Sequence, residues 1–149
     1  MEISLDGKVA LVTGASRGIG RAIAAAFVAA GGQVMLSSRK QDQLEAAAAD
    51  IDPSGLRTAV HAANAGDLDA AAACVAATID RFGRLDVLVN NAATNPYYGP
   101  TLGVDPPRYD KTFDVNLRGP LFWCQQAWQQ AFEASPGVIV NVASVGGLR

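Results

Sequence analysis

The sequence predicts an α/β fold in which helices cover both faces of a doubly wound parallel sheet. Short apolar runs, typical of buried parallel strands, alternate with longer segments that have helical spacing. The first run leads into a glycine-rich turn, TGASRGIG at residues 13–20, and then into an alanine-rich helix. Repeated strand–helix units with right-handed crossovers then predict the strand order 3-2-1-4-5.

The predicted elements alternate in order along the chain. Strands are expected at the short apolar runs, residues 9–13, 33–38, 57–62, 86–90 and 137–143. Helices are expected at the longer periodic segments, residues 21–30, 41–51, 67–82 and 109–132. The fourth strand is an almost unbroken apolar run, which indicates the centre of a parallel sheet.

The apolar repeat also predicts which helix faces are buried. The first helix is expected to bury Ile19, Ile23, Phe27 and Ala30. The third is expected to bury Leu68, Ala71, Val75, Ile79 and Phe82. The last helix carries too many large apolar residues for one face, so we expect it to contact the sheet and a second copy of the chain. Trp123 and Trp128 are expected in the core or at that interface.

Composition limits the class of protein. The 149 residues are 50% hydrophobic and 17% charged, which favours a single globular domain over residues 1–149. The net charge of −2 gives nucleic acid no basic surface to bind. The longest apolar run, residues 22–30, is well short of the roughly 18 residues that span a membrane. With no signal peptide visible at the acidic N-terminus, we expect a cytoplasmic protein that binds neither nucleic acid nor membrane.

Two cysteines lie far apart in segments with helical spacing. Cys74 and Cys124 are therefore expected to be reduced core thiols, and neither a disulfide nor a metal site is expected. The lone histidine, His61, is expected to be structural, because it lies near the third predicted strand and far from the glycine turn.

The glycine turn is a candidate phosphate site. The free N–H groups and positive dipole end of the following helix favour an anion, and glycines let the backbone approach a pyrophosphate closely. The candidate binding residues in this turn are Gly14, Ser16, Arg17, Gly18, Ile19 and Gly20. The spacing G-x-x-x-G-x-G is one residue longer than the commoner G-x-G-x-x-G turn.

Further motifs follow the turn in order. They are Asn90-Asn91-Ala92-Ala93, Asp114-Val115-Asn116 and Ser144. With the turn they resemble the short-chain dehydrogenase/reductase family over the whole chain. Residues 37–40 and 91–96 are similar to its NADP-dependent carbonyl and retinol reductase branch. The resemblance implies a Rossmann-type, NAD(P)-binding domain and hydride transfer to or from a small-molecule carbonyl or alcohol.

The charge pattern predicts which dinucleotide is bound. An NAD site places Asp or Glu about 20 residues past the turn, where this chain has Ser38 and Arg39. A guanidinium binds a ribose 2′-phosphate bidentately, and Arg17 could reach the same group from the turn. We therefore expect NADP(H) in preference to NAD. The alternative is that both arginines are solvated surface charges.

The resemblance implies three further cofactor contacts. Asn64 stands where the family has an aspartate that accepts a hydrogen bond from the adenine amine, although it could also be a turn residue. Asn90 and Ala92 belong to the segment that supports the cofactor ribose and the sheet. Ala93 replaces the family glycine there. Tyr97 and Tyr98 could line the substrate pocket or pack within the loop.

Two residues are candidates for catalysis. Pro120 has no N–H to bond the carbonyl of Asn116 in a helix, and the family uses an asparagine carbonyl here to hold a relay water. Alternatively, residues 119–120 simply break the helix. Ser144 matches the family serine that binds the substrate oxygen.

The family's proton donor is a tyrosine followed four residues later by a lysine. None of Tyr97, Tyr98 and Tyr109 has a lysine at that distance. Without that pair and the last strands and helices of the family fold, we expect the isolated 149-residue chain to be inactive and to self-associate or dissolve poorly. The alternative is a truncated, non-catalytic remnant that binds nucleotide or a partner.

Overall fold

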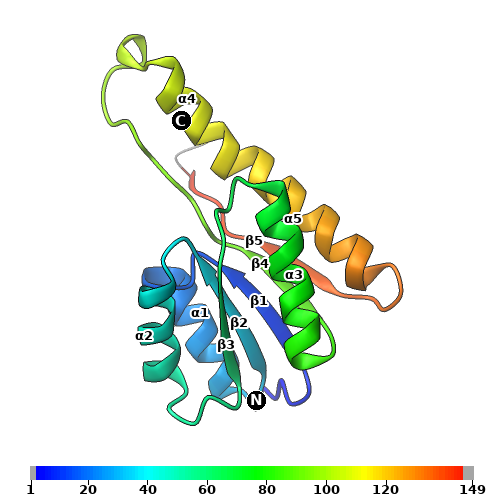
Figure 1. Cartoon of the computed structure of the whole chain (residues 1–149). Helices are drawn as coiled ribbons and strands as arrows, with labels where there is room; N and C mark the ends of the chain where they lie inside the picture. The colour runs from blue at the N-terminus through cyan, green and yellow to red at the C-terminus, as the bar shows by residue number, and fades with distance from the viewer. Residues whose placement is uncertain (1–2, 146–149) are drawn as a thin grey trace.

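A computed structural model describes residues 3–145 and contains a five-stranded parallel sheet (Figure 1). The strands are β1 (Val9–Thr13), β2 (Gln33–Ser38), β3 (Thr58–Ala62), β4 (Val87–Asn90) and β5 (Val138–Asn141). They lie in the order β3-β2-β1-β4-β5, and each neighbouring pair is parallel. The predicted fold class and strand order are confirmed.

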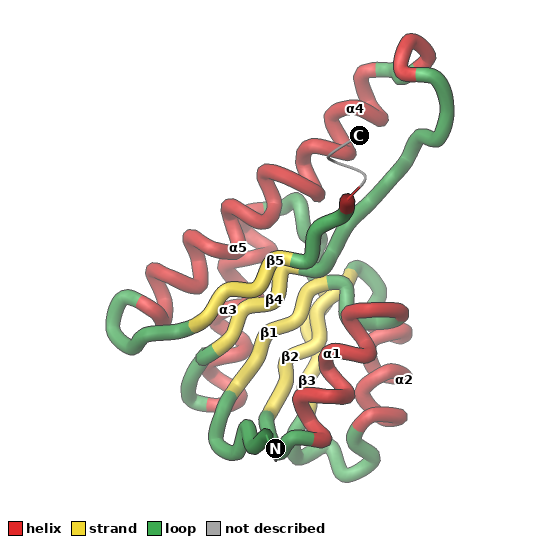
Figure 2. The backbone as a smooth tube through the Cα atoms, turned by 180° about the vertical axis from the view of Figure 1, so that it is seen from behind, coloured by secondary structure: helices red, strands yellow, loops and turns green. Residues whose placement is uncertain are grey.

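Helices cover both faces of the sheet. On one face lie α1 (Gly18–Ala29) and α2 (Gln41–Ile51), and on the other lies α3 (Leu68–Phe82) beside a longer helical rod (Figure 1). The rod consists of α4 (Pro106–Phe113), the π-helical turn η2 (Asp114–Arg118), α5 (Gly119–Ala127) and the π-helical turn η3 (Trp128–Phe132). In Figure 2 its α4 end projects beyond the sheet, together with the preceding loop and its short 3₁₀ helix η1 (Thr101–Gly103).

Alternate residues of the central strands β1 and β2 supply the two halves of the core. Leu11 and Met35 pack with Trp123 and with residues of α3. Val12 and Leu36, one position later on the same strands, pack with residues of α1 and α2. This alternation of side chains between faces is what makes a parallel sheet apolar along its whole length.

The predicted buried face of α1 is wrong in part. The helix begins at Gly18, and its buried residues are Gly20 and Ala24. Ile19 is 64% exposed, because it lies in the first turn above the end of the sheet. Ile23 and Phe27 pack against the core but are only partly buried. Small side chains therefore let α1 approach the strands closely.

Two other helix predictions need correction. Leu68 is exposed on α3, although Ala71 and Val75 of the same predicted face are buried. The expected helix over 109–132 begins earlier, at Pro106, because the Asp105 side chain accepts a hydrogen bond of 2.9 Å from the Arg108 N–H. It is also interrupted by η2 and η3, which the apolar repeat did not predict.

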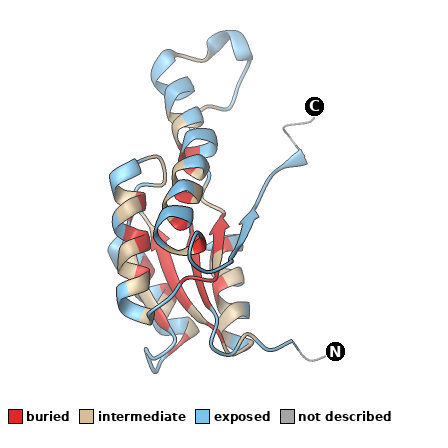
Figure 3. Cartoon of the chain, turned by 90° about the vertical axis from the view of Figure 1, so that its right-hand side faces the viewer, coloured by how far each residue is buried: buried red, intermediate tan, exposed pale blue. Residues whose placement is uncertain are grey.

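Burial is uneven across the molecule. Figure 3 shows buried residues concentrated in the central strands, whereas β5 and the α4 end of the rod are largely exposed. Cys74 is buried, Cys124 is partly buried, and both are free thiols. Within residues 3–145 there is no helix long and apolar enough to cross a membrane. The same residues contain no group of three or more potential metal ligands.

Candidate functional site

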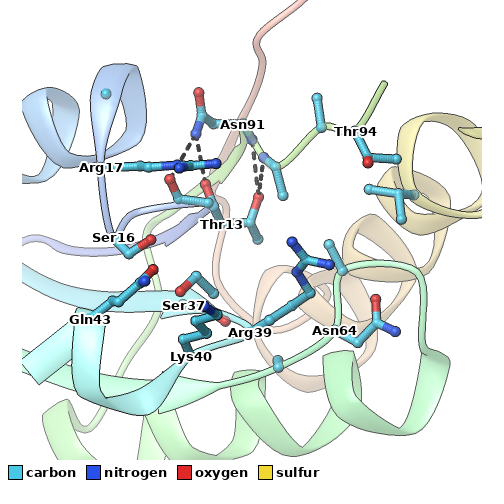
Figure 4. A pocket seen from close by; sticks show the side chains of 18 of the residues that line it. Thr13, Ser16, Arg17, Ser37, Arg39, Lys40, Gln43, Asn64, Asn91 and Thr94 are labelled. Carbon is cyan, nitrogen blue, oxygen red and sulfur yellow. Dashed lines mark hydrogen bonds between the residues drawn. The ribbon is translucent and has the colours of Figure 1, made fainter. Parts of the chain in front are cut away.

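A cavity of about 430 Å³ opens at the carboxyl ends of the central strands (Figure 4). Its walls come from the glycine turn after β1, the end of β2, the segments that follow β3 and β4, and one side of the helical rod. The chain reverses its winding direction between β1 and β4, and ligands of open α/β sheets bind at such a switch point.

The structure brings most of the predicted cofactor residues together around this cavity. Its lining includes Gly14, Ser16, Arg17, Gly18, Ile19, Ser38, Arg39, Asn64 and Ala92. Gly20 and Asn90 stand outside the lining and pack behind it.

The glycine turn has a backbone that only glycine adopts easily. Gly14 and Gly18 have φ angles of +66° and +56°. A Cβ on Gly14 would lie 2.9 Å from the Cα of Ala92, whereas one on Gly18 would meet nothing within 4 Å. A Cβ on Gly20 would collide with the carbonyl oxygen of Gly14. The absence of a side chain at Gly14 and Gly20 therefore lets the turn pack closely against Ala92 and against itself, whereas the space beside Gly18 is open.

Side chains from two strands hold the turn in place. The Thr13 hydroxyl accepts hydrogen bonds of 3.0 Å from the N–H groups of both Asn91 and Ala92, and it donates one of 3.3 Å to the Val89 carbonyl. The Asn91 amide donates to the carbonyls of Thr13, at 2.9 Å, and Gly14, at 3.3 Å (Figure 4). The ends of β1 and β4 thus form one rigid floor.

The cavity is electropositive. Arg17, Arg39, Lys40 and Lys111 line it, and no described lining residue is acidic. Figure 4 shows Arg17 and Arg39 extending into the cavity from different walls. The N-terminus of α1 adds its dipole, because no side chain within the described residues caps it and its first turn contains no acidic residue. The walls suit a ligand with several negative charges.

One polar atom in the wall lacks a partner. The Ser38 hydroxyl oxygen is buried and makes no hydrogen bond to any residue among 3–145. Buried hydroxyls normally have a partner, so a bound polar ligand is the natural one for Ser38. This orphaned oxygen lies in the wall of a cavity that two arginines also line, which suits a polar ligand with anionic groups.

Asn64 and Asn90 differ in what they contact. Asn64 lines the cavity, and its Oδ1 also accepts a hydrogen bond of 3.1 Å from the Gly66 N–H, so it is a turn residue as well. Asn90 is buried behind the wall, where its amide donates to Asn141 Oδ1 at 2.9 Å and to Cys124 Sγ at 3.4 Å. Asn90 therefore links β4 to β5 and to α5.

The two candidate catalytic residues lie outside the cavity lining. Asn116 sits in η2, where its amide pairs with the backbone of Thr94: Thr94 N–H donates to Oδ1 at 2.8 Å, and Nδ2 donates to the Thr94 carbonyl at 2.8 Å. Thr94 itself lines the cavity. Ser144 follows β5 and is exposed.

Comparison with known proteins decides the family. The family model described as short chain dehydrogenase matches residues 8–149. This chain belongs to the short-chain dehydrogenase/reductase family.

Relatives of this short-chain dehydrogenase/reductase are similar along nearly all of it. Sorbitol dehydrogenase from Cereibacter sphaeroides is 38% identical over 146 residues, which cover 97% of this chain and 56% of the relative. A solved Brucella melitensis structure, a short-chain dehydrogenase/reductase of the glucose/ribitol dehydrogenase type, is 33% identical with a TM-score of 0.90; the match covers 100% of this chain and 61% of that one.

A second solved structure carries a cofactor. It is a metagenomic short-chain oxidoreductase in complex with NADP, 36% identical with a TM-score of 0.87, and the match covers 99% of this chain and 66% of that one. The present short-chain dehydrogenase/reductase spans about half the length of the curated relatives it matches.

Sequence reasoning missed several residues of the site. The sequence assigns Asn91 only to the segment after the fourth strand, whereas in the structure its amide ties the glycine turn to the end of β4. Lys111 and Trp123 reach the cavity from the rod, which the apolar pattern alone could not place against the end of the sheet. By contrast, Tyr97 packs within its loop, where its hydroxyl donates to the Pro100 carbonyl at 2.9 Å, and Tyr98 is 98% exposed.

Proposed function

We propose that this chain forms the cofactor-binding part of an NADP(H)-dependent oxidoreductase that interconverts small-molecule carbonyls and alcohols. The observation that carries the proposal is the cavity with two arginines and two lysines in its walls and no carboxylate among its described lining residues. A carboxylate there would repel a ribose 2′-phosphate, whereas these side chains attract it. A similar solved structure is a complex with NADP, which supports the same cofactor here.

Each wall has a part of the cofactor to hold. The glycine turn and the N-terminus of α1 would bind the pyrophosphate. Arg17, Ser38 and Arg39 would bind the 2′-phosphorylated ribose, and Asn64 would accept from the adenine amine. Ala92 would support the cofactor ribose, and Asn90, which lies behind the wall, would support the sheet. Bound NADPH supplies a hydride for a carbonyl carbon, and bound NADP accepts one from an alcohol.

Two residues would act on the substrate side. We assign Ser144 the orientation of the substrate oxygen. Asn116 would hold a relay water through its carbonyl, for which Pro120, lacking an N–H, cannot compete. Meanwhile the Asn116 side chain is committed to the backbone of Thr94, so it fixes the loop beside the cavity rather than contacting substrate. A cytoplasmic location and a homo-oligomer remain predictions.

The 149-residue polypeptide is expected to bind NADPH without reducing carbonyls. No tyrosine in it has a lysine four residues later, so it offers no activated phenol as proton donor. On a polypeptide of verified mass, NADPH titration tests the binding and a reductase assay tests the absence of carbonyl reduction. Carbonyl reduction by that polypeptide would refute the inactivity, and failure to bind NADPH would refute the cofactor assignment.

Cofactor preference tests the proposal directly. We expect NADPH to bind about tenfold to a hundredfold more tightly than NADH, the equivalent of roughly 1.5–3 kcal/mol for a charge-assisted hydrogen bond. Arg39→Asp is expected to remove this preference. Arg21→Gln is the matched control, because Arg21 points from α1 to Asp50 at 2.8 Å and does not line the cavity. Equal affinities in the unmodified chain, or a preference that survives Arg39→Asp, would rule out the assignment.

A further inference from the structure

The indole of Trp123 connects the core of the protein to the cavity wall. Trp123 lies on α5, is 1% exposed, and belongs to the core cluster shared by α3 and the sheet. Its Nε1–H donates a hydrogen bond of 3.0 Å to the carbonyl oxygen of Ala65. Both residues line the cavity.

The segment that contains Ala65 needs such a support. It follows β3 and is attached to β2 at one end, where the Ala63 N–H donates to the Ser38 carbonyl at 2.9 Å. Beyond that point it leaves the sheet and turns through the Asn64–Gly66 hydrogen bond, which is local. The position of residues 64–66 is therefore set by what they pack against.

That packing partner is η2 together with the start of α5. A Cβ on Gly119 would collide with the carbonyl oxygen of Ala65, and one on Gly66 would lie 3.1 Å from the carbonyl oxygen of Asp114. Two backbones thus meet without side chains between them, and the Trp123 hydrogen bond fixes their distance. An apolar side chain at position 123 could fill the core, but it would leave the Ala65 carbonyl without this donor.

We propose that Trp123 is a positioning residue for the cofactor: through Ala65 it sets the wall that receives the adenine half of NADP(H). This inference rests on the proposed function, because Asn64 in that wall is the residue assigned to adenine. Loss of the indole N–H loosens residues 64–66 and weakens binding of the adenine half, while the glycine turn, held by Thr13 and Asn91, keeps its geometry.

Two variants separate this role from a general loss of stability. Trp123→Phe keeps an aromatic ring in the core and removes the N–H. Phe132→Leu is the matched control, because Phe132 is buried in the same cluster, lies on the same rod and does not line the cavity. Both variants are expected to unfold more easily than the unmodified chain.

Amide hydrogen exchange is the first readout. We expect faster exchange at residues 64–66 in Trp123→Phe than in Phe132→Leu, with the glycine turn at residues 13–20 unchanged in both. Equal exchange at residues 64–66 in the two variants would overturn the proposal, whether or not the protein binds NADP(H).

Calorimetric binding of the two cofactor halves is the second readout. For Trp123→Phe we expect affinity for 2′,5′-ADP to fall about fivefold to tenfold, as loss of one hydrogen bond predicts, and affinity for reduced nicotinamide mononucleotide to stay within about twofold. Phe132→Leu is expected to leave both unchanged. If Trp123→Phe binds 2′,5′-ADP as tightly as the unmodified chain, the positioning role is wrong and the proposed function stands. If the unmodified chain does not bind 2′,5′-ADP, the proposed function itself is wrong.

Discussion

At the scale of single residues, the floor of the cavity depends on a few main-chain contacts at the end of β1. Gly14 turns the chain with a left-handed backbone and lies directly against Ala92. Asn91 bonds the two carbonyls at this point, and Thr13 bonds the two N–H groups opposite. A small change at Gly14 therefore meets backbone, which cannot move aside as a flexible side chain could.

Gly14→Ala and Gly18→Ala are expected to differ in cost. Both place a Cβ on a left-handed backbone, which costs about 1–2 kcal/mol. Gly14→Ala also forces the Cβ against Ala92, which adds about 1–3 kcal/mol of overpacking, whereas the space around Gly18 is open. Urea unfolding of the two variants measures the difference. Equal losses of stability would mean that the β1 and β4 ends are not held as tightly as the contacts indicate.

The contrast between these two glycines could not be predicted from the sequence. The turn motif predicts a phosphate-binding role for both, but only the fold shows which one touches Ala92. The role of Asn91 could not be predicted for a similar reason. Asn90 and Asn91 are adjacent and identical in type, yet Asn90 is buried behind the wall and Asn91 donates a hydrogen bond to the turn. The positive charges of Arg17 and Arg39 could be identified from the sequence alone, because Arg17 lies in the turn and Arg39 follows the second strand.

Ionisation of Asp86 is expected to make the free energy of unfolding depend on pH in the acid range. Burial raises the pKa of this carboxyl, but hydrogen bonds from Arg84 at 2.8 and 2.6 Å and from the Val9 N–H at 2.9 Å outweigh it and hold the pKa below its usual value of 3.8. The fold thus favours the ionised form. The stabilisation by ionised Asp86 is fully present above the pKa that this carboxyl has in the unfolded chain. It is lost as the pH falls through the lower pKa that the carboxyl has in the folded protein.

Asp86→Asn tests this linkage. At neutral pH we expect it to lower the free energy of unfolding by about 1–3 kcal/mol, because charge-assisted bonds to a buried acceptor are weakened. Below pH 3.8 the difference from the unmodified chain should narrow, as Asp86 itself becomes protonated. Asp80→Asn, on the exposed side of α3, is the control and should change stability by less than about 0.5 kcal/mol. A difference that stays constant into acid would contradict the assignment.

At the scale of elements, α1 and α3 begin in opposite ways. The Asp67 side chain caps α3 by accepting from the Ala70 N–H at 3.0 Å, and Asp69 adds negative charge to its first turn. At α1 the residue before the helix is Arg17, whose side chain makes no capping bond. The first N–H groups of α1 are thus left for an anion, at some cost to the helix when none is bound.

Ile19→Glu should move stability and cofactor affinity in opposite directions. A carboxylate in the first turn of α1 stabilises the helix by about 0.3–1 kcal/mol, and little burial is lost because Ile19 is largely exposed. The same charge repels phosphate, so NADPH affinity should fall at least about tenfold, or 1.4 kcal/mol. Thermal unfolding and NADPH titration measure the two effects, with Ile19→Gln as the uncharged control. Unchanged NADPH affinity in Ile19→Glu would show that the pyrophosphate does not bind at this helix end.

The sequence pattern predicts the positions of strands and helices but not the irregular turns within the helical rod. Strand positions follow from short apolar runs in the sequence, and β2 and α2 were predicted with their observed bounds. The π-helical turns η2 and η3 were not predicted, because this segment has large apolar residues on more than one face, so a shift in its apolar repeat cannot be recognised. Pro120 was the one local signal, and the structure places it just after η2, where Asn116 reaches Thr94.

At the scale of the whole molecule, the exposed hydrophobic residues within 3–145 include two extended apolar surfaces. One is the edge strand β5, where Val138, Ile139 and Val140 are all exposed. The other is a stripe along the helical rod at a spacing of four residues, Phe113, Leu117 and Leu121. A strand edge offers unpaired backbone groups to any other strand, whereas a helical stripe offers side chains to a matching stripe on a second copy. We therefore expect the two surfaces to cause different kinds of association.

The 149-residue polypeptide should self-associate in sedimentation experiments, with a dimer in exchange with monomer and a tendency to form larger species. Leu117→Lys with Leu121→Lys is expected to remove the dimer, because two buried cations would face each other across the helical stripe. Val140→Lys is expected to reduce the larger species and leave the dimer, because lysine on an edge strand opposes further pairing. Sedimentation velocity over a concentration series separates these effects. A monodisperse monomer at every concentration would contradict the predicted homo-oligomer, and loss of the dimer in Val140→Lys alone would move the interface from the rod to the sheet edge.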